Sequence, residues 1–121
     1  MATAKRILFV TETRDLGTKL LMPVVRRLVK GFIRLGHDTQ IFSWNHAWVT
    51  INPISQMRWA RRWRQGHTKK RINHQLENQI KRYDPQIICI TFPKSLDGRT
   101  VDMIRQAAPS AFVLGVDVDL W

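Results

Sequence analysis

Four short apolar runs, separated by longer segments of helical periodicity, form the main pattern of this chain. Each run is continuous rather than alternating, which is typical of parallel strands that helices cover on both faces. The runs predict strands over residues 6–11, 39–44, 86–92 and 111–116. Strands that alternate with helices in this way predict an α/β domain with a parallel sheet.

Helical spacing of apolar residues marks two of the intervening segments. After the first strand, one apolar face predicts a helix that ends just before Gly36, and its members are Leu21, Val25, Leu28, Phe32 and Leu35. His37 follows at the turn into the second strand, where we interpret it as structural. After the third strand, a helix is expected over residues 97–107.

Two helices are expected between the second and third strands. The first is short and amphipathic, with Trp59 and Trp63 on one face, and Gly66 is expected to end it. The second stops at Asp84–Pro85, because the residue before a proline avoids the helical conformation. Its apolar stripe consists of Ile72, Leu76, Ile80 and Tyr83.

The predicted fold is a Rossmann-like parallel sheet of about four strands, in the order 3-2-1-4, with helices on both faces. The length of 121 residues suits a single domain over residues 1–121. Few residues follow the fourth strand, so we expect this domain to be the N-terminal piece of a longer two-domain protein.

Composition indicates an ordinary globular domain, with 44% hydrophobic and 24% charged residues. No apolar run approaches the roughly 18 residues of a spanning helix, and the N-terminus lacks the apolar region of a signal peptide. We therefore expect a cytoplasmic protein, with peripheral contact to a membrane left open. Cys89 is the only cysteine and is expected to be buried and inert. The four histidines lack the spacing of metal ligands, so no metal site is expected.

A parallel sheet binds ligands beyond the carboxyl ends of its strands, where the strand order reverses. In the order 3-2-1-4 this point lies between the first and fourth strands. The candidate catalytic bases there are Glu12, Asp117 and Asp119. The candidate ligand-binding residues are Thr11, Thr13, Arg14, Gly17, Thr18, Lys94 and Ser95. The alternative is that the acids are ordinary loop residues, and the first loop has neither a dinucleotide fingerprint nor a Walker A motif.

The net charge of +11 is concentrated in one segment, since residues 53–82 contain nine basic residues and one acid, or +8. The candidate contacts to an anionic surface are Arg58, Trp59, Arg61, Arg62, Trp63 and Arg64. A basic helix with tryptophans suits an anionic membrane interface. Nucleic acid, which would use the same cations and stacking aromatics, is the less favoured partner. The plainest alternative is a connecting helix with its basic face in water.

Several segments resemble one known superfamily. "RILFV" opens the chain before a loop with Gly17, and "RLGHDTQIF" joins a helix end to a strand. "NHQLENQIKRYDPQIICI" runs from an asparagine-led helix through a turn into an apolar strand, and "GVDVDLW" places an acidic pair after the last strand. Over nearly its whole length the chain resembles the amino-terminal domain of GT-B glycosyltransferases, of the spore-maturation-protein type.

The resemblance implies transfer of a sugar from a nucleotide-sugar donor to an acceptor of unknown identity. In that superfamily the amino-terminal domain binds the acceptor and the carboxy-terminal domain holds the nucleotide sugar. The implied partner is a missing C-terminal GT-B domain, so this chain alone would be inactive and would bind no cofactor itself. The residues implied to line the cleft are Glu12, Arg14, Asp117 and Asp119, with one acid as the base.

A non-catalytic Rossmann-like binding domain remains the alternative. Cobalamin-binding domains share a similar glycine-histidine helix end and a strand similar to "DPQIICIT". Those that bind through a histidine carry it in the loop after the first strand, and "ETRDLG" has none. The alternative also includes an anionic surface or nucleic acid bound through the basic segment 56–71.

Overall fold

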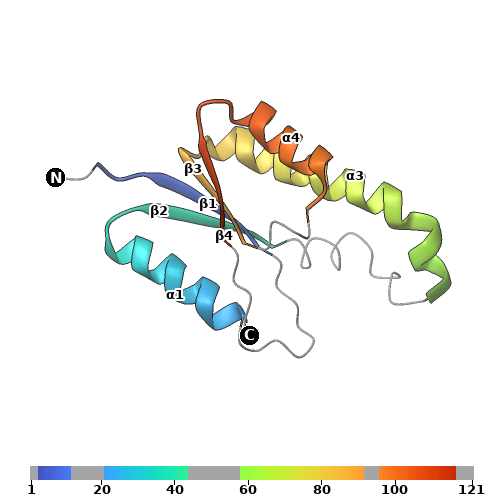
Figure 1. Ribbon diagram of the computed structural model, residues 1–121, viewed down its shortest axis with the longest axis horizontal. Helices are drawn as coiled ribbons and strands as arrows, with labels where there is room; N and C mark the ends of the chain where they lie inside the picture. Colours follow the sequence, from blue (N-terminus) through green and yellow to red (C-terminus); the bar gives the residue numbers. More distant parts are fainter. Residues whose placement is uncertain (1–2, 12–20, 44–57, 92–95, 117–121) are drawn as a thin grey trace.

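The computed structural model describes residues 3–11, 21–43, 58–91 and 96–116, with the backbone alone for residues 21–24 and 58–68. Helices and strands alternate along the chain (Figure 1). Their order is β1 (Arg6–Thr11), α1 (Leu21–Arg34), β2 (Asp38–Ser43), α3 (Arg58–Tyr83), β3 (Ile87–Thr91), α4 (Gly98–Ala107) and β4 (Phe112–Val116). All four strands predicted from the apolar runs are present, within one residue at each end.

The four strands form one all-parallel sheet in the order β2-β1-β3-β4. The predicted α/β class and parallel sheet are confirmed, but the predicted order 3-2-1-4 is wrong. The third strand pairs with β1 instead of with β2. The physical reason lies in the polarity of the sequences. Strand β2 ("DTQIFS") is largely polar, which suits an edge, and three of its six residues are exposed, whereas β3 ("IICIT") is largely apolar, and four of its five residues are buried. A central place for β3 therefore removes more apolar surface from water.

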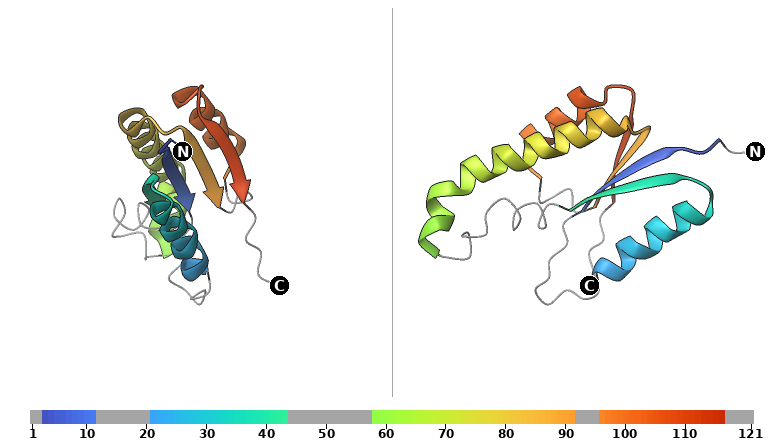
Figure 2. Two further views of the ribbon diagram at one scale, coloured as in Figure 1. Left: turned by 90° about the vertical axis from the view of Figure 1, so that its left-hand side faces the viewer. Right: turned by 180° about the vertical axis from the view of Figure 1, so that it is seen from behind.

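Helices cover both faces of the sheet, as Figure 2 shows. On one face, α1 packs over a buried cluster formed by Ile7, Phe9, Val25, Val29 and Cys89. On the other face, α3 and α4 pack over a larger cluster formed by Leu8, Val10, Phe42, Ile72, Leu76, Ile80, Ile88, Ile90, Ile104 and Ala108. Cys89 is buried as predicted, and burial raises the pKa of its thiol.

Helix α3 is a single helix from Arg58 to Tyr83, so the predicted break at Gly66 is wrong. One glycine within a helix costs only about 1 kcal/mol relative to alanine, and its neighbours are mainly good helix formers. At about 1.5 Å per residue the helix is about 39 Å long, roughly twice the length of a five- or six-residue strand. Among the side chains described for this helix, the buried stripe begins at Ile72. The amino-terminal half therefore extends past the carboxyl ends of the strands (Figure 1).

The amino ends of the strands are held by turns with defined hydrogen bonds. Gly36 has a φ of +89° and ends α1, as the sequence predicts for a helix C-terminal glycine. His37 accepts a hydrogen bond at Nδ1 from the backbone N–H of Lys5, at 3.0 Å. This bond ties the start of β1 to the turn before β2, so His37 has a structural role.

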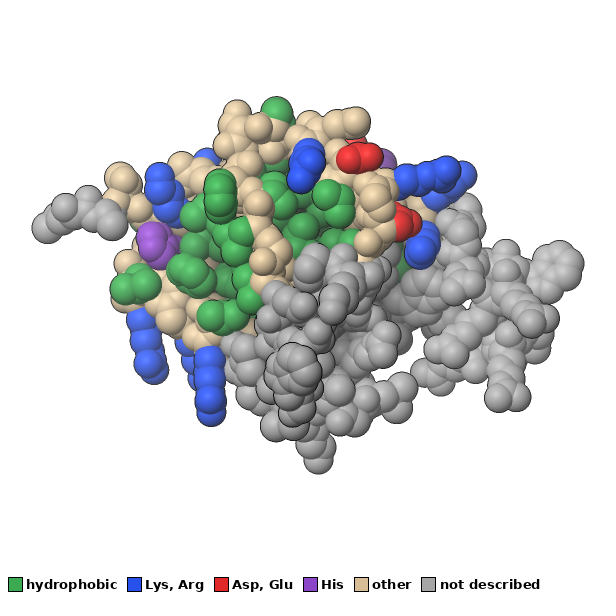
Figure 3. All heavy atoms as spheres, viewed as in Figure 1, with side chains coloured by type: hydrophobic (Ala, Val, Ile, Leu, Met, Phe, Trp, Pro, Cys, Tyr) green, Lys and Arg blue, Asp and Glu red, His purple; other side chains and the backbone are tan. Residues whose placement is uncertain are grey.

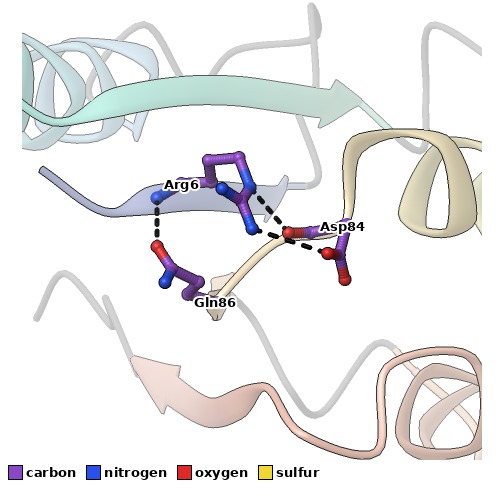
Figure 4. A network of polar contacts seen from close by, with 3 residues as sticks. All are labelled: Arg6, Asp84 and Gln86. Atoms are coloured by element: carbon purple, nitrogen blue, oxygen red, sulfur yellow. Dashed lines mark hydrogen bonds and ion pairs between the residues drawn. The ribbon is translucent and has the colours of Figure 1, made fainter.

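A second set of polar contacts joins β1 to the turn between α3 and β3 (Figure 4). Arg6 donates from Nε to the backbone oxygen of Asp84 at 2.8 Å, and its Nη2 lies 3.5 Å from the Asp84 carboxylate. The backbone N–H of Arg6 donates to Oε1 of Gln86 at 3.1 Å. Asp84 adopts a φ of +51°, which stops α3 directly before Pro85.

Candidate functional site

The strand order places the reversal point of the sheet between β1 and β3. The chain leaves β1 through α1 on one face and leaves β3 through α4 on the other face. Because successive connections depart in opposite directions, the carboxyl ends of these two strands are where sheets of this type place a ligand. The predicted point between the first and fourth strands is therefore wrong, since β3 separates β1 from β4.

Two buried threonines end the strands on either side of this point. Thr11 is the last residue of β1 and Thr91 is the last residue of β3, and they are 1% and 2% exposed. Both side chains lie on the α1 face, because side chains alternate along a strand and Phe9 and Cys89 belong to the cluster beneath α1. The carboxyl edge next to α1 thus carries two hydroxyl groups.

The two hydroxyl groups differ in their hydrogen bonding. Oγ1 of Thr91 donates to the backbone oxygen of Val10 over 3.5 Å, which is a long bond. Oγ1 of Thr11 is buried and has no hydrogen-bond partner in the part of the chain that the structure describes. A buried hydroxyl without a partner costs about 1–3 kcal/mol. Such a group suits a bound ligand that supplies the missing bond.

Thr11 is the one predicted site residue whose side chain the structure describes. The other candidates after β1 and β3 lie outside the described residues, namely Glu12, Thr13, Arg14, Gly17, Thr18, Lys94 and Ser95. Asp117 and Asp119 also lie outside them, and they follow β4 rather than a strand next to β1. For the basic segment the structure gives the helical backbone alone, so the predicted contacts of Arg58, Trp59, Arg61, Arg62, Trp63 and Arg64 stay predictions.

Thr91 was not predicted as a site residue. A signal for it exists, because the two apolar runs "RILFVT" and "IICIT" both end in threonine. Its relevance depends on β3 lying next to β1, and the expected strand order placed these strands apart.

A polar link braces the start of α4 against α3 near the same edge. The Asp97 carboxylate caps α4 and accepts hydrogen bonds from the backbone N–H of Thr100 at 2.9 Å and from its hydroxyl at 2.8 Å. The hydroxyl of Thr100 also lies 3.1 Å from Oδ1 of Asn73 on α3, as an alternative acceptor for its one proton. Lys69 Nζ lies 3.6 Å from the Asp97 carboxylate.

These contacts lower the pKa of Asp97, with the backbone hydrogen bond from Thr100 as the largest cause. The carboxylate therefore stays ionised near neutral pH. The link holds the amino end of α4 against α3.

A polar groove of about 690 Å³ lies between β2 and α3 at the amino end of the sheet. Its lining consists of Arg6, Asp38, Gln40, Gln75, Asn78, Gln79, Arg82 and Tyr83. Burial, followed by the neighbouring Asp38 carboxylate, raises the pKa of Tyr83 to about 12. The negative charge of Asp38 acts on the pKa of Tyr83 through its proximity, because no described residue makes a hydrogen bond of good geometry with the Tyr83 hydroxyl. The groove lies at the end of the sheet opposite the reversal point.

Within the described ranges, no three His, Cys, Asp or Glu side chains lie close enough together to hold a metal ion. None of the helices there is long and apolar enough to cross a membrane. Comparison of the chain with models of known families, with curated proteins and with solved structures found no match. The resemblance to GT-B glycosyltransferases therefore remains a prediction from the sequence motifs.

Proposed function

We propose that the chain is the acceptor-side domain of a GT-B-type glycosyltransferase and that its acceptor binds between the ends of β1 and β3. The observation that carries the choice of site is the reversal point of the parallel sheet, bordered by the buried Thr11 and Thr91. The motifs that resemble this superfamily also lie at the helix-to-strand junctions where the resemblance places them. "RLGH" ends α1 before β2, and "YDPQIICI" joins α3 to β3.

The proposed chemistry needs one base next to an acceptor hydroxyl. Glu12 directly follows Thr11 in the sequence and is the candidate for this role. It takes the proton of the acceptor hydroxyl while the acceptor oxygen forms a bond to the anomeric carbon of the donor sugar. The bond from that carbon to the nucleoside diphosphate breaks, and the diphosphate leaves with the electron pair. The hydroxyl of Thr11 would hydrogen bond to the acceptor.

The donor would be held by a partner domain of the same GT-B type. We therefore expect the isolated chain to bind acceptors without transferring sugar. Asp117 and Asp119 become weaker candidates for the base, because β3 lies between β1 and the strand that they follow.

Acceptor binding can be tested on the chain itself by nuclear magnetic resonance. Glycosides and lipid-linked sugars are titrated into labelled protein, and nucleotide sugars are titrated in parallel. The proposal expects an acceptor to shift the signals of Thr11 and Thr91, and nucleotide sugars to leave them unchanged. Shifts confined to residues far from the carboxyl edge would contradict the proposed site.

Catalysis is tested on the protein expressed from its whole coding sequence. Release of nucleoside diphosphate from a panel of nucleotide sugars is measured for the parent protein and for Glu12→Gln. Loss of a general base lowers turnover by about 10²–10⁴-fold. Unchanged turnover in the variant would exclude Glu12 as the base, and the absence of turnover with every donor would refute the enzyme assignment.

A second candidate is a non-catalytic domain that binds a cofactor-like ligand. The observed order β2-β1-β3-β4 favours it, since doubly wound domains of the flavodoxin-like order bind a flat cofactor between their first and third strands. Titration with a cobalamin and with flavin mononucleotide, followed by absorbance, separates this candidate from the first. Binding of either with loss in Thr11→Val would favour the second candidate.

A contact to an anionic surface is a further proposal for the basic helix. Among the residues of α3 whose side chains the structure describes, the buried ones begin at Ile72, and the segment from Arg58 to Arg71 contains seven basic residues and no acid. Sedimentation with phosphatidylserine vesicles tests this contact. Replacement of Arg58, Arg61, Arg62 and Arg64 by glutamate should abolish binding, and unchanged binding would refute the proposal.

A further inference from the structure

The α1 face of the sheet is only partly covered. A helix is about 10–12 Å wide with its side chains, whereas the outer strands of a four-stranded sheet lie about 14 Å apart between their axes. The single helix α1 lies over the central strands, where Val25 and Val29 join Ile7, Phe9 and Cys89 in one buried cluster. The part of this face over β4 therefore has no helix above it among the described elements.

Apolar side chains occupy this uncovered part. Phe112 is 66% exposed, and Leu114 and Val116 on the same side of β4 are partly exposed. The register places Phe112 next to Ile87 of β3. Figure 3 shows hydrophobic side chains gathered between the place of α1 and the place of β4. Neighbouring apolar side chains that stay accessible to solvent can form an interaction surface.

One flank of α1 continues this surface. One side of α1 carries Leu28, Gly31 and Leu35, which recur at helical spacing. Because the β1-α1-β2 connection is right-handed, this side of the helix faces β3 and β4. Leu28 packs against the cluster beneath α1, and Leu35 is 73% exposed. We call the combined surface the apolar strip, and it consists of Leu28, Leu35, Ile87, Phe112, Leu114 and Val116.

Gly31 provides room beside the apolar strip. A glycine within a helix costs about 1 kcal/mol relative to alanine, so its presence in the middle of α1 calls for a reason. Apart from its two chain neighbours and the backbone of α1, no atom of the described residues lies within 4 Å of the place that a Cβ of residue 31 would occupy. Nothing in the described fold thus requires a glycine at this position. The open space would let the backbone of a neighbouring helix approach α1 closely.

The positive charge of α1 limits which partners can bind to the apolar strip. The exposed rim of α1 carries Arg27, Lys30 and Arg34, and α1 contains no acid. No ion pair within the described ranges involves these three residues. A second copy of this chain, with a net charge of +11, would bring further cations toward this rim. A partner with acidic residues on the matching flank complements it.

We propose that the apolar strip is the docking surface for an amphipathic helix of a protein partner, which lies beside α1 and carries acidic residues on the flank next to α1. A helix fits because the uncovered strip is about two strand spacings wide, or about 10 Å. Its apolar face covers Phe112, Leu114 and Val116, and its backbone approaches Gly31. The proposal is independent of the glycosyltransferase assignment.

A designed peptide tests the charge and the chemistry of the proposed partner. It has about 16 residues, near the length at which isolated helices become stable, with a leucine and alanine face and glutamates along one flank. Its binding to the whole chain is followed by fluorescence anisotropy. The matched peptide has lysines in place of the glutamates, and we expect at least about tenfold weaker binding, since like charges oppose association. Equal binding of the two peptides would overturn the proposal.

Two exposed side chains of α1 provide a matched pair of variants. Leu35 lies on the flank with the apolar strip, whereas Ile33, which is 53% exposed, lies on the opposite flank. Leu35→Ser and Phe112→Ser should each weaken binding of the acidic peptide by about fivefold or more, as expected for apolar contacts at an interface. Ile33→Ser should change it by less than about twofold. Equal losses in Leu35→Ser and Ile33→Ser would overturn the assignment of the surface.

Gly31→Gln separates docking from folding. Because no described atom beyond the chain neighbours and the backbone of α1 lies within 4 Å of this position, the variant should keep or raise the melting temperature of the protein. It should nevertheless weaken binding of the acidic peptide by about tenfold, since the new side chain occupies the place of the docked backbone. Unchanged binding in this variant would overturn the proposed close approach.

Light scattering of the chain without peptide tests a second copy of the chain as the occupant. The proposal expects a monomer. A dimer that Phe112→Ser converts to monomers would identify a second copy as the occupant of the apolar strip and would overturn the proposal.

Discussion

The two faces of the sheet differ in how completely helices cover them. Among the described residues, ten form the buried cluster beneath α3 and α4, whereas five form the cluster beneath α1. The α1 face also holds the exposed Phe112 and the buried Thr11 hydroxyl without a partner. Most of the apolar burial thus lies on one face, and the features that suit recognition lie on the other. Substitutions on the two faces should therefore have different effects.

The largest loss of stability is expected on the α3 and α4 face. Leu76 is completely buried between α3 and the sheet. Leu76→Ala should lower the free energy of unfolding by about 2–5 kcal/mol, because it removes apolar contacts and leaves a cavity. Urea unfolding followed by circular dichroism measures the change. A loss below 1 kcal/mol would mean that this face is not the main core.

A smaller loss is expected from the corresponding change on the α1 face. Val29 is 9% exposed and packs over the central strands. Val29→Ala should lower the free energy of unfolding by about 1–2 kcal/mol, since about two methyl-sized groups leave the core and α1 can settle onto the sheet. The same urea measurement applies. A loss as large as that of Leu76→Ala would remove the difference between the two faces.

The polar link between α3 and α4 should contribute less than either apolar contact. Asp97→Ala removes the helix cap and should cost about 1 kcal/mol at neutral pH. The ion pair with Lys69 adds little to this value, because both side chains are largely exposed.

The effect of Asp97→Ala should depend on pH. The folded protein lowers the pKa of this carboxyl group, so its contribution is fully present above about pH 4, where the unfolded group is also ionised. The contribution is lost as the pH falls through the lowered pKa. The difference between the parent protein and the variant should therefore shrink from pH 7 to pH 3. A difference that stays constant over this range would exclude the charge as its cause.

The comparison of the faces also shows what the sequence could predict. Continuous apolar runs marked all four strands, and the apolar stripe from Ile72 to Ile80 marked the packed half of α3. The strand order was missed, because the choice of neighbour for β1 depends on the relative burial of whole strands. The exposed polar residues of β2 held that information. The break expected at Gly66 was wrong, since local propensity at one residue does not outweigh a long run of helix formers.

The candidate site was predicted only in part. The carboxyl edge of β1 and its Thr11 followed from the α/β pattern, and that edge lies at the reversal point of the sheet. Thr91 was missed, because its place next to β1 depends on the strand order. The apolar strip was not foreseen either. Its residues are distributed over α1, β3 and β4, and only their spatial arrangement makes them one surface.

The smallest effect on stability should come from Thr11, and its sign should be opposite to that of the others. Thr11→Val replaces the buried hydroxyl without a partner by a methyl group of similar size. It should raise the free energy of unfolding by about 1 kcal/mol, at the low end of the cost of a buried hydroxyl without a partner, because that cost disappears. Thr91→Val is the matched control on the neighbouring strand, and it should lower stability by a similar amount, since its hydroxyl donates to Val10. If ligands bind at the reversal point, Thr11→Val should also weaken their binding. A protein that gains stability while it loses a ligand shows that the residue is kept for recognition. A variant that loses stability would instead show that the Thr11 hydroxyl already has a partner in the folded chain. Among the described residues of the α1 face, no buried side-chain polar group without a partner would then remain.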